Sequence, residues 1–167
     1  MQSLYFEFGS GVVAGNTGVM LQNRGSFFSL EANYTNSLEP CKRSFHTLMP
    51  AIACKDGKPS ILYGKQGGEG QPQTQTAIIN RMIDYGMDPQ GAINEPRFVW
   101  GRTWGEDSEA LRIESRVKED VIVELKEKGH LVEFDGVMGQ AQAIQIDEHN
   151  FLKGGGDPRG DGAAVGS

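Results

Sequence analysis

The stretch Tyr63-Gly-Lys-Gln-Gly67-Gly68-Glu-Gly-Gln71-Pro72-Gln-Thr-Gln joins a predicted strand to a predicted helix through two adjacent glycines. Gly67 and Gly68 have no Cβ that would block a ligand, and Pro72 is typical of a first helical turn. The first N–H groups of a helix lack partners within it and point at whatever binds in front. The stretch therefore predicts an anion site, which in an acyl-transfer enzyme would be an oxyanion hole. A plain tight turn into a helix is the alternative that this loop alone leaves open.

The rest of the chain alternates between short strands and helices. Asp56-Gly57 between apolar runs is a strong hairpin signal, and it predicts strands at 49–54 and 60–63. Apolar residues recur at helical spacing over 71–85 and 118–128, and a glycine follows each run. The other expected elements are a brief helix from Pro89 to before Pro96 and strands at 12–14, 19–22, 97–100, 111–114, 131–134, 141–146 and 151–153. No repeat or linker is visible, so residues 1–167 are predicted to form a single domain.

Composition is that of an ordinary globular protein. The chain has 167 residues, 38% of them hydrophobic, and could bury a single core. Its formal net charge of −6 argues against a nucleic-acid partner. It contains no apolar run long enough to span a bilayer, so no membrane partner is expected either.

Cysteine and histidine spacing gives no sign of a metal site. Cys41 and Cys54 lack a C-x-x-C spacing, which favours free, buried or half-exposed thiols over a disulfide and mildly favours a reducing, cytoplasmic location. His46, His130 and His149 lie far apart without a zinc-binding spacing. No metal or organic cofactor is therefore expected.

Several motifs occur in a fixed order around the glycine pair. They are Gly9-Ser-Gly-Val-Val-Ala-Gly-Asn-Thr-Gly18, Lys42-Arg43-Ser-Phe-His46-Thr47-Leu-Met-Pro50, Asp84-Tyr-Gly-Met-Asp88-Pro89, Ala92-Ile-Asn-Glu-Pro96-Arg97, Gly139-Gln-Ala-Gln142 and Gly155-Gly-Asp157-Pro158-Arg159-Gly160-Asp161. Any one of them is weak, but the ordered set is specific. Over nearly its whole length the chain resembles the small catalytic subunit of the γ-glutamyltransferase family. Its departures from the glutathione-processing members look like the acylase-like branch, which includes cephalosporin acylases and broad γ-glutamyl hydrolases.

The resemblance implies an α+β fold, the αββα sandwich of the N-terminal-nucleophile hydrolases. It also implies cleavage of γ-glutamyl or related acyl amides through an acyl-threonine intermediate, without a cofactor. In the family, the nucleophilic threonine opens the small subunit and precedes a first strand, whereas this chain starts at Met1 within what resembles the second strand. The chain is therefore expected to be a fragment of the small-subunit region, truncated at its first strand and inactive by itself.

A truncated sheet has consequences for the partners of the chain. The edge left by the missing strand would expose unpaired backbone donors and acceptors, which predicts self-association. The resemblance implies a large-subunit-like polypeptide as partner, together with the missing N-terminal strand and a small-molecule amide substrate. The alternative function is that of a catalytically inactive interaction or scaffold fragment.

Three residues match the catalytic positions of the family. Gly67 and Gly68 match the oxyanion pair, and Ser3 matches a position where family members keep a hydroxyl beside the nucleophile. A serine there could hydrogen-bond the nucleophile, and a solvent-facing hydroxyl at a strand end is the alternative.

The matching substrate-binding positions depart from the glutathione-processing pattern. Tyr5 and Phe27 stand where polar and acidic side chains hold the α-amino group of a γ-glutamyl moiety, and Phe27 cannot bind an ammonium group as a carboxylate does. Arg24 replaces an amide residue and could hold a carboxylate in a bidentate pair, unless it is a solvated surface arginine. His46 and Thr47 stand where two serines hold the substrate carboxylate, and both can donate hydrogen bonds.

Two further expectations concern packing. His46 packed against Phe45 and Leu48 is the alternative to a substrate-binding histidine. In the tail, an Arg159–Asp161 charge pair is expected to fix the glycine-rich turns near the active-site wall.

Overall fold

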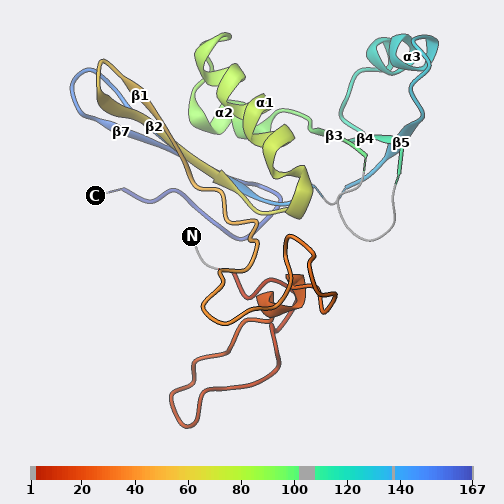
Figure 1. Cartoon of the computed structure of the whole chain (residues 1–167). Helices are drawn as coiled ribbons and strands as arrows, with labels where there is room; N and C mark the ends of the chain where they lie inside the picture. The colour runs from red at the N-terminus through yellow and green to blue at the C-terminus, as the bar shows by residue number, and fades with distance from the viewer. Residues whose placement is uncertain (1–2, 102–107, 137, 167) are drawn as a thin grey trace. The chain divides into compact units, whose positions relative to one another are not determined.

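The computed structural model describes residues 3–101, 108–136 and 138–166 (Figure 1). The chain divides into two compact units, Met1–Leu48 and Met49–Ser167, and each is described by itself. The single domain over residues 1–167 stays a prediction.

The first unit consists mainly of turns. Its one helical element among the described residues is the 3-10 helix η1, Arg24–Phe27. The strands predicted at 12–14 and 19–22 are wrong, because only an isolated bridge between Val13 and Met20 joins these segments. Both segments are largely exposed, so their apolar residues have no core face on which to pack as strands.

A four-stranded antiparallel sheet forms the centre of the second unit, with the strand order β1-β2-β6-β7. Its strands are β1 Ala51–Lys55, β2 Lys58–Lys65, β6 Ala141–Ile146 and β7 Leu152–Gly156. Asp56 and Gly57 join β1 to β2, which confirms the predicted hairpin. Strand β2 therefore lies inside the sheet and carries its C-terminal end into the glycine pair.

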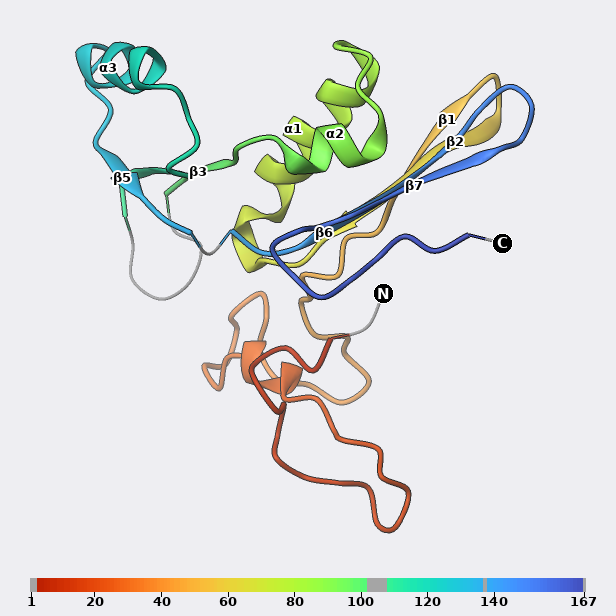
Figure 2. The same cartoon turned by 180° about the vertical axis from the view of Figure 1, so that it is seen from behind.

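Helices α1, Gln71–Ile83, and α2, Pro89–Asn94, lie on one face of this sheet (Figures 1 and 2). The Asp88 side chain caps α2 by accepting a hydrogen bond from the Gly91 N–H at 2.8 Å. The buried apolar residues between helices and sheet are Ile61, Ile78, Met82, Ala92, Ile93, Ala141 and Ala143. Strand β7 approaches α2 closely at Gly155, where a Cβ would lie 2.7 Å from the carbonyl carbon of Pro89.

A smaller three-stranded sheet has its own core. It comprises β3 Phe98–Trp100, β4 Leu111–Ile113 and β5 Val132–Phe134, with helix α3, Glu119–Glu127, between the parallel strands β4 and β5. Leu111, Ile113 and Ile122 form the buried centre of this part.

The mixed α+β class is confirmed, and the residues described supply one helix layer and one sheet layer of the predicted sandwich. On the sheet face opposite α1 and α2, Ile52, Leu62 and Ile144 lie in cross-strand register, and Ile52 is 60% exposed. The second sheet of an αββα sandwich stays a prediction.

Candidate functional site

The glycine pair lies where β2 passes into α1. Gly67 has φ 134° and Gly68 has φ 52°, values that glycine adopts without the strain a side chain would cause. A short 3-10 turn, η2 Gly68–Gly70, leads directly into α1. Within the described part of the chain, no hydrogen bond uses the N–H group of Gly67 or of Gly68. The predicted strand, glycine turn and helix are all present, and two N–H donors remain available to a ligand.

The segment before β6 packs against this loop. The Gln66 N–H donates to the carbonyl oxygen of Gln140 at 2.8 Å. A Cβ on Gly139 would lie 1.9 Å from the carbonyl oxygen of Gln66, so only glycine allows this approach. The Gly70 N–H closes the turn by donating to the Gly67 carbonyl oxygen at 3.1 Å. The loop is thus held between β6 and the start of α1.

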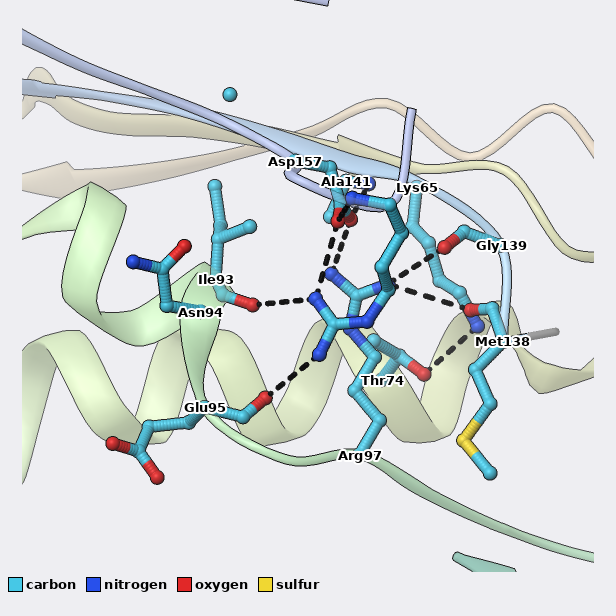
Figure 3. A network of polar contacts seen from close by, with 12 residues as sticks. Lys65, Thr74, Ile93, Asn94, Glu95, Arg97, Met138, Gly139, Ala141 and Asp157 are labelled. Carbon is cyan, nitrogen blue, oxygen red and sulfur yellow. Dashed lines mark hydrogen bonds and ion pairs between the residues drawn. The ribbon is translucent and has the colours of Figure 1, made fainter. Parts of the chain in front are cut away.

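Lys65, the last residue of β2, is buried at 2% exposure and contacts Thr74 (Figure 3). Its Nζ donates to Thr74 Oγ1 at 2.8 Å and to the Gly70 carbonyl oxygen at 3.4 Å. Burial, followed by the positive charge of Arg97, lowers the pKa of Lys65 to about 8, although Asp157 opposes this shift.

Arg97 and Asp157 form a buried ion pair beside Lys65, with both side chains 1% exposed (Figure 3). Arg97 Nη1 also donates to the Gly139 carbonyl oxygen at 2.8 Å, and the Ala141 N–H donates to the Asp157 carboxylate at 2.6 Å. Burial alone would raise the pKa of Asp157, but hydrogen bonds from the Arg159 N–H, Arg97 and the Ala141 N–H together lower it. The pair joins the chain before β3 to the tail after β7, and through Gly139 it reaches the segment that packs on Gln66.

Arg159 extends the network toward β4. Its Nε and Nη2 both donate to the carboxylate of Glu114, the Nη2 bond at 2.7 Å. Its Nη1 donates to the carboxylate of Asp157 at 3.1 Å. The expected Arg159–Asp161 pair is therefore wrong. Glu114 is 6% exposed, so it provides a buried, charge-assisted contact that exposed Asp161 cannot match.

Sequence reasoning missed Lys65 and Glu114 as members of this network. The signal for Lys65 was the alternation along β2, because Lys65 shares a face with Ile61 and Tyr63 and is thereby directed inward. Glu114 gave no local signal, since its partner Arg159 lies 45 residues away in the sequence.

In the first unit, three of the predicted substrate-binding residues lie together. The ring centroids of Tyr5 and Phe27 are 4.3 Å apart, and Arg24 Cζ lies 5.2 Å from the centroid of Tyr5. Arg24 is 4% exposed, so it is not a solvated surface arginine. Its Nε donates to Gln22 Oε1 at 3.2 Å, whereas its buried Nη1 and Nη2 have no hydrogen-bond partner among the described residues. A buried guanidinium with two free donors is suited to a carboxylate ligand.

The other predicted residues of this unit are Ser3, His46 and Thr47. Ser3 is exposed, and its Oγ accepts a hydrogen bond from the Tyr5 N–H at 3.0 Å. His46 is exposed, which argues against the packed histidine, and Thr47 is half-buried. Phe45 contacts Phe27 edge-on at 5.0 Å. The roles of Ser3, His46 and Thr47 in binding or catalysis stay predictions.

The described residues offer neither a disulfide nor a metal cluster. Cys41 and Cys54 are free and exposed, more open than expected. Among these residues, no cluster of three histidine, cysteine or acidic side chains could hold a metal ion. None of the helices described has both the length and the apolar character needed to cross a bilayer.

Comparison with known proteins decides the family. The sequence model of the family described as Gamma-glutamyltranspeptidase matches residues 1–167. The chain belongs to this family. The predicted resemblance to γ-glutamyltransferases is thereby confirmed.

Relatives within the gamma-glutamyltranspeptidase family include two bacterial proenzymes. The Glutathione hydrolase-like YwrD proenzyme of Bacillus subtilis (strain 168) is 69% identical over 99% of this chain and 32% of its own length. The Oxamate amidohydrolase proenzyme of Klebsiella pneumoniae is 45% identical over 99% of this chain and 32% of its own length. The chain therefore spans about a third of these curated relatives.

Solved structures agree with this assignment. Cephalosporin acylase from Bacillus halodurans superposes with a TM-score of 0.85 at 36% identity, over 98% of this chain and 30% of that chain. A mutant of the Helicobacter pylori Gamma-Glutamyltranspeptidase superposes with a TM-score of 0.82 at 26% identity, over 96% of this chain and 91% of that chain. The α+β fold thus matches members of the N-terminal-nucleophile hydrolases.

Proposed function

We propose that the chain is part of an enzyme that cleaves γ-glutamyl or related acyl amides through an acyl-threonine intermediate. The nucleophilic threonine and a large-subunit-like partner come from polypeptide outside residues 1–167. The observation that carries this proposal is the pair of unused N–H groups at Gly67 and Gly68, in front of α1. Membership of the gamma-glutamyltranspeptidase family supports it.

The reaction places negative charge at the glycine pair. When the threonine hydroxyl oxygen attacks the amide carbon, the carbonyl oxygen becomes an oxyanion that accepts hydrogen bonds from the two N–H groups. The amine then leaves with a proton and an acyl ester remains, which water hydrolyses or an acceptor amine removes. Donors held in place before the reaction stabilise such an oxyanion strongly, and loss of one donor costs roughly a hundredfold to a thousandfold in kcat.

The polypeptide outside the chain also completes the fold in this proposal. The sheet face with Ile52, Leu62 and Ile144 carries apolar side chains in register, as the inner face of a two-sheet sandwich does. A second sheet packed there would give the αββα architecture. Ser3 would contribute its hydroxyl beside the nucleophile.

The cluster around Arg24 defines the substrate class. Arg24 Nη1 and Nη2 supply two donors to a substrate carboxylate, while the rings of Tyr5 and Phe27 provide no carboxylate for a substrate ammonium group. His46 and Thr47 add further hydrogen-bond donors. Amides of dicarboxylic acids without an α-amino group, such as glutaryl amides, are therefore preferred over zwitterionic γ-glutamyl amides. The similarity to a protein named for oxamate, the monoamide of a dicarboxylic acid that carries no ammonium group, supports this preference.

Kinetics on two matched substrates test the proposal. In the intact polypeptide that includes these residues, we expect glutaryl-p-nitroanilide to be cleaved at least as well as γ-glutamyl-p-nitroanilide. Arg24→Met should lower kcat/KM for both by roughly tenfold to a hundredfold, the effect of losing a charged hydrogen bond. Arg43→Met, at an exposed arginine of the same unit, is the control and should leave kcat/KM unchanged.

Each part of the proposal has its own contrary result. A strong preference for the γ-glutamyl substrate, or an unaffected Arg24→Met variant, would remove the carboxylate site. An intact polypeptide without activity on either amide would favour the inactive scaffold. Substantial turnover by residues 1–167 alone would show that the nucleophile lies within them.

A further inference from the structure

A buried ammonium group lies directly behind the glycine pair. A Cβ built on Gly67 would be 3.1 Å from both Cε and Nζ of Lys65, so the end of this side chain touches the backbone of the loop. Nζ also donates to the carbonyl oxygen of Gly70, at the other end of η2. Thr74 Oγ1, on the first turn of α1, accepts a hydrogen bond from the same nitrogen. One side chain therefore connects the strand end, the turn and the helix start.

Lys65 carries the excess positive charge of this region. Arg97 is paired with Asp157, and Arg159 is paired with both Asp157 and Glu114. No carboxylate among the described residues pairs with Lys65 Nζ, which instead contacts a hydroxyl and a carbonyl oxygen. In a water-poor interior, a charge acts on its neighbours far more strongly than in bulk water. An anion in front of Gly67 and Gly68 would add a second negative charge to that of Asp157, which already favours the ammonium form of Lys65.

We propose that Lys65 is a positioning residue of the anion site. It holds the Gly67–Gly68 turn in place and supplies a positive charge next to the N–H groups of the two glycines. Anions therefore bind well there only while Lys65 is protonated. This inference rests on the proposed function for the assignment of the glycine pair as the anion site. It assigns no proton transfer to Lys65.

The charged groups around Lys65 make its protonation adjustable near neutral pH. Arg97, which precedes β3, and Arg159, in the tail after β7, disfavour the ammonium form, whereas Asp157 favours it. With burial as the largest cause, the pKa of Lys65 lies at about 8. The arginines and Asp157 keep their charges through this pH range, because their ordinary pKa values lie far from it. Anion affinity should therefore fall as the pH rises through about 8.

Amide chemical shifts measure anion binding at the pair without requiring activity. Labelling with carbonyl-13C glutamine and 15N glycine selects glycines that follow glutamine, which in these residues are Gly67 and Gly91. Gly91 serves as the internal control, since its N–H is already donated to Asp88. The shift is read on the glycine nitrogen through the labelled glutamine carbonyl carbon with carbon detection, because an amide proton without a hydrogen-bond partner exchanges rapidly with water at high pH. Acetate is titrated into the intact polypeptide at about pH 7 and at about pH 9.5, on either side of the Lys65 transition.

We expect acetate to shift the Gly67 amide at the lower pH with at least about tenfold higher affinity than at the higher pH. In Lys65→Met, binding should be roughly tenfold to a hundredfold weaker at the lower pH and no longer change with pH. This variant should fold, because methionine replaces a buried charge by an apolar chain of similar length. Lys58→Met, at the exposed start of the same strand, should behave like the wild type.

Two kinds of result would contradict these expectations, and they distinguish an error about Lys65 from an error about the anion site. If wild type and Lys65→Met bind acetate equally, or if wild-type binding does not change between the two pH values, the role of Lys65 is refuted and the anion site remains. If acetate leaves the Gly67 amide of the wild type unmoved at both pH values, the inference fails together with the oxyanion assignment.

Discussion

Asp157→Asn tests the buried ion pair that joins the C-terminal tail to the chain before β3. The Asp157 carboxylate accepts a hydrogen bond from Arg97 Nη2. It also accepts hydrogen bonds from the backbone N–H of Ala141 at 2.6 Å and from the backbone N–H of Arg159 at 3.0 Å. Asparagine keeps the shape and one acceptor oxygen but removes the charge. The Arg97 guanidinium, 1% exposed, is then left without a counter-charge.

Removing one partner of a buried ion pair costs about 3–5 kcal/mol of unfolding free energy. Arg97 keeps its hydrogen bonds to the carbonyl oxygens of Gly139 and Met138, so we expect the lower end, about 3 kcal/mol. Against a typical total stability of about 5–15 kcal/mol this is a large loss. The second unit should still fold, but it should unfold at a lower urea concentration.

Urea unfolding followed by far-UV circular dichroism measures the effect. With a slope of about 2 kcal/mol per molar urea, the midpoint should fall by about 1.5 M. Asp161→Asn, at an exposed position of the same tail, is the matched control and should change stability by less than about 0.5 kcal/mol. Adding Arg97→Met to Asp157→Asn should recover part of the loss, since the unpaired charge is then gone.

The pH dependence supplies an independent check. Because the folded-state pKa of Asp157 is lowered, its stabilising contribution is present above about pH 4 and is lost as the pH falls through the folded value. The difference between wild type and Asp157→Asn should therefore shrink in acid. A variant within about 1 kcal/mol of wild type at neutral pH would contradict the importance of the pair.

Two other predictions concern packing and charge in the second unit. The folded-state pKa of Lys65 is about 8, whereas its ordinary value is 10.5, so the unfolding free energy of the wild type should rise with pH between these two values. Lys65→Met should abolish this rise, and its unfolding free energy should exceed that of the wild type by about 2 kcal/mol at neutral pH. A pH-independent wild type would contradict it. Gly155→Ala should lose roughly 1–3 kcal/mol of unfolding free energy, measured by urea unfolding, because its Cβ would lie 2.7 Å from the backbone of Pro89. Gly136→Ala is the control, since a Cβ there meets open space. Equal stability of the two variants would refute the close packing at Gly155.

Local sequence signals explain why so much of the secondary structure was predictable. Asp56-Gly57 and the apolar spacing of α1 act over a few residues, so the hairpin and the helix follow from short-range preferences. The predicted strands at 12–14 and 19–22 failed because alternation stabilises a strand only when one face is buried. A sequence pattern alone does not state whether a core is present.

The functional residues divide in the same way. The glycine pair was predictable, because the conformation it needs is a property of glycine itself. The burial of Arg24 was not, since it depends on how Tyr5 and the rest of the first unit fold around the side chain. Glu114 as the partner of Arg159 was equally invisible, because an ion pair forms wherever the fold brings opposite charges together.

The sequence by itself thus determined the family, the mixed α+β class, the order of the elements in the second unit and the glycine turn between β2 and α1. Only the tertiary structure decided that Lys65 lies buried behind that turn and that Arg97 and Asp157, 60 residues apart, close the network beside it. The physical reason is that turns and helices are stabilised by neighbours in the sequence, whereas burial and charge pairing depend on neighbours in space.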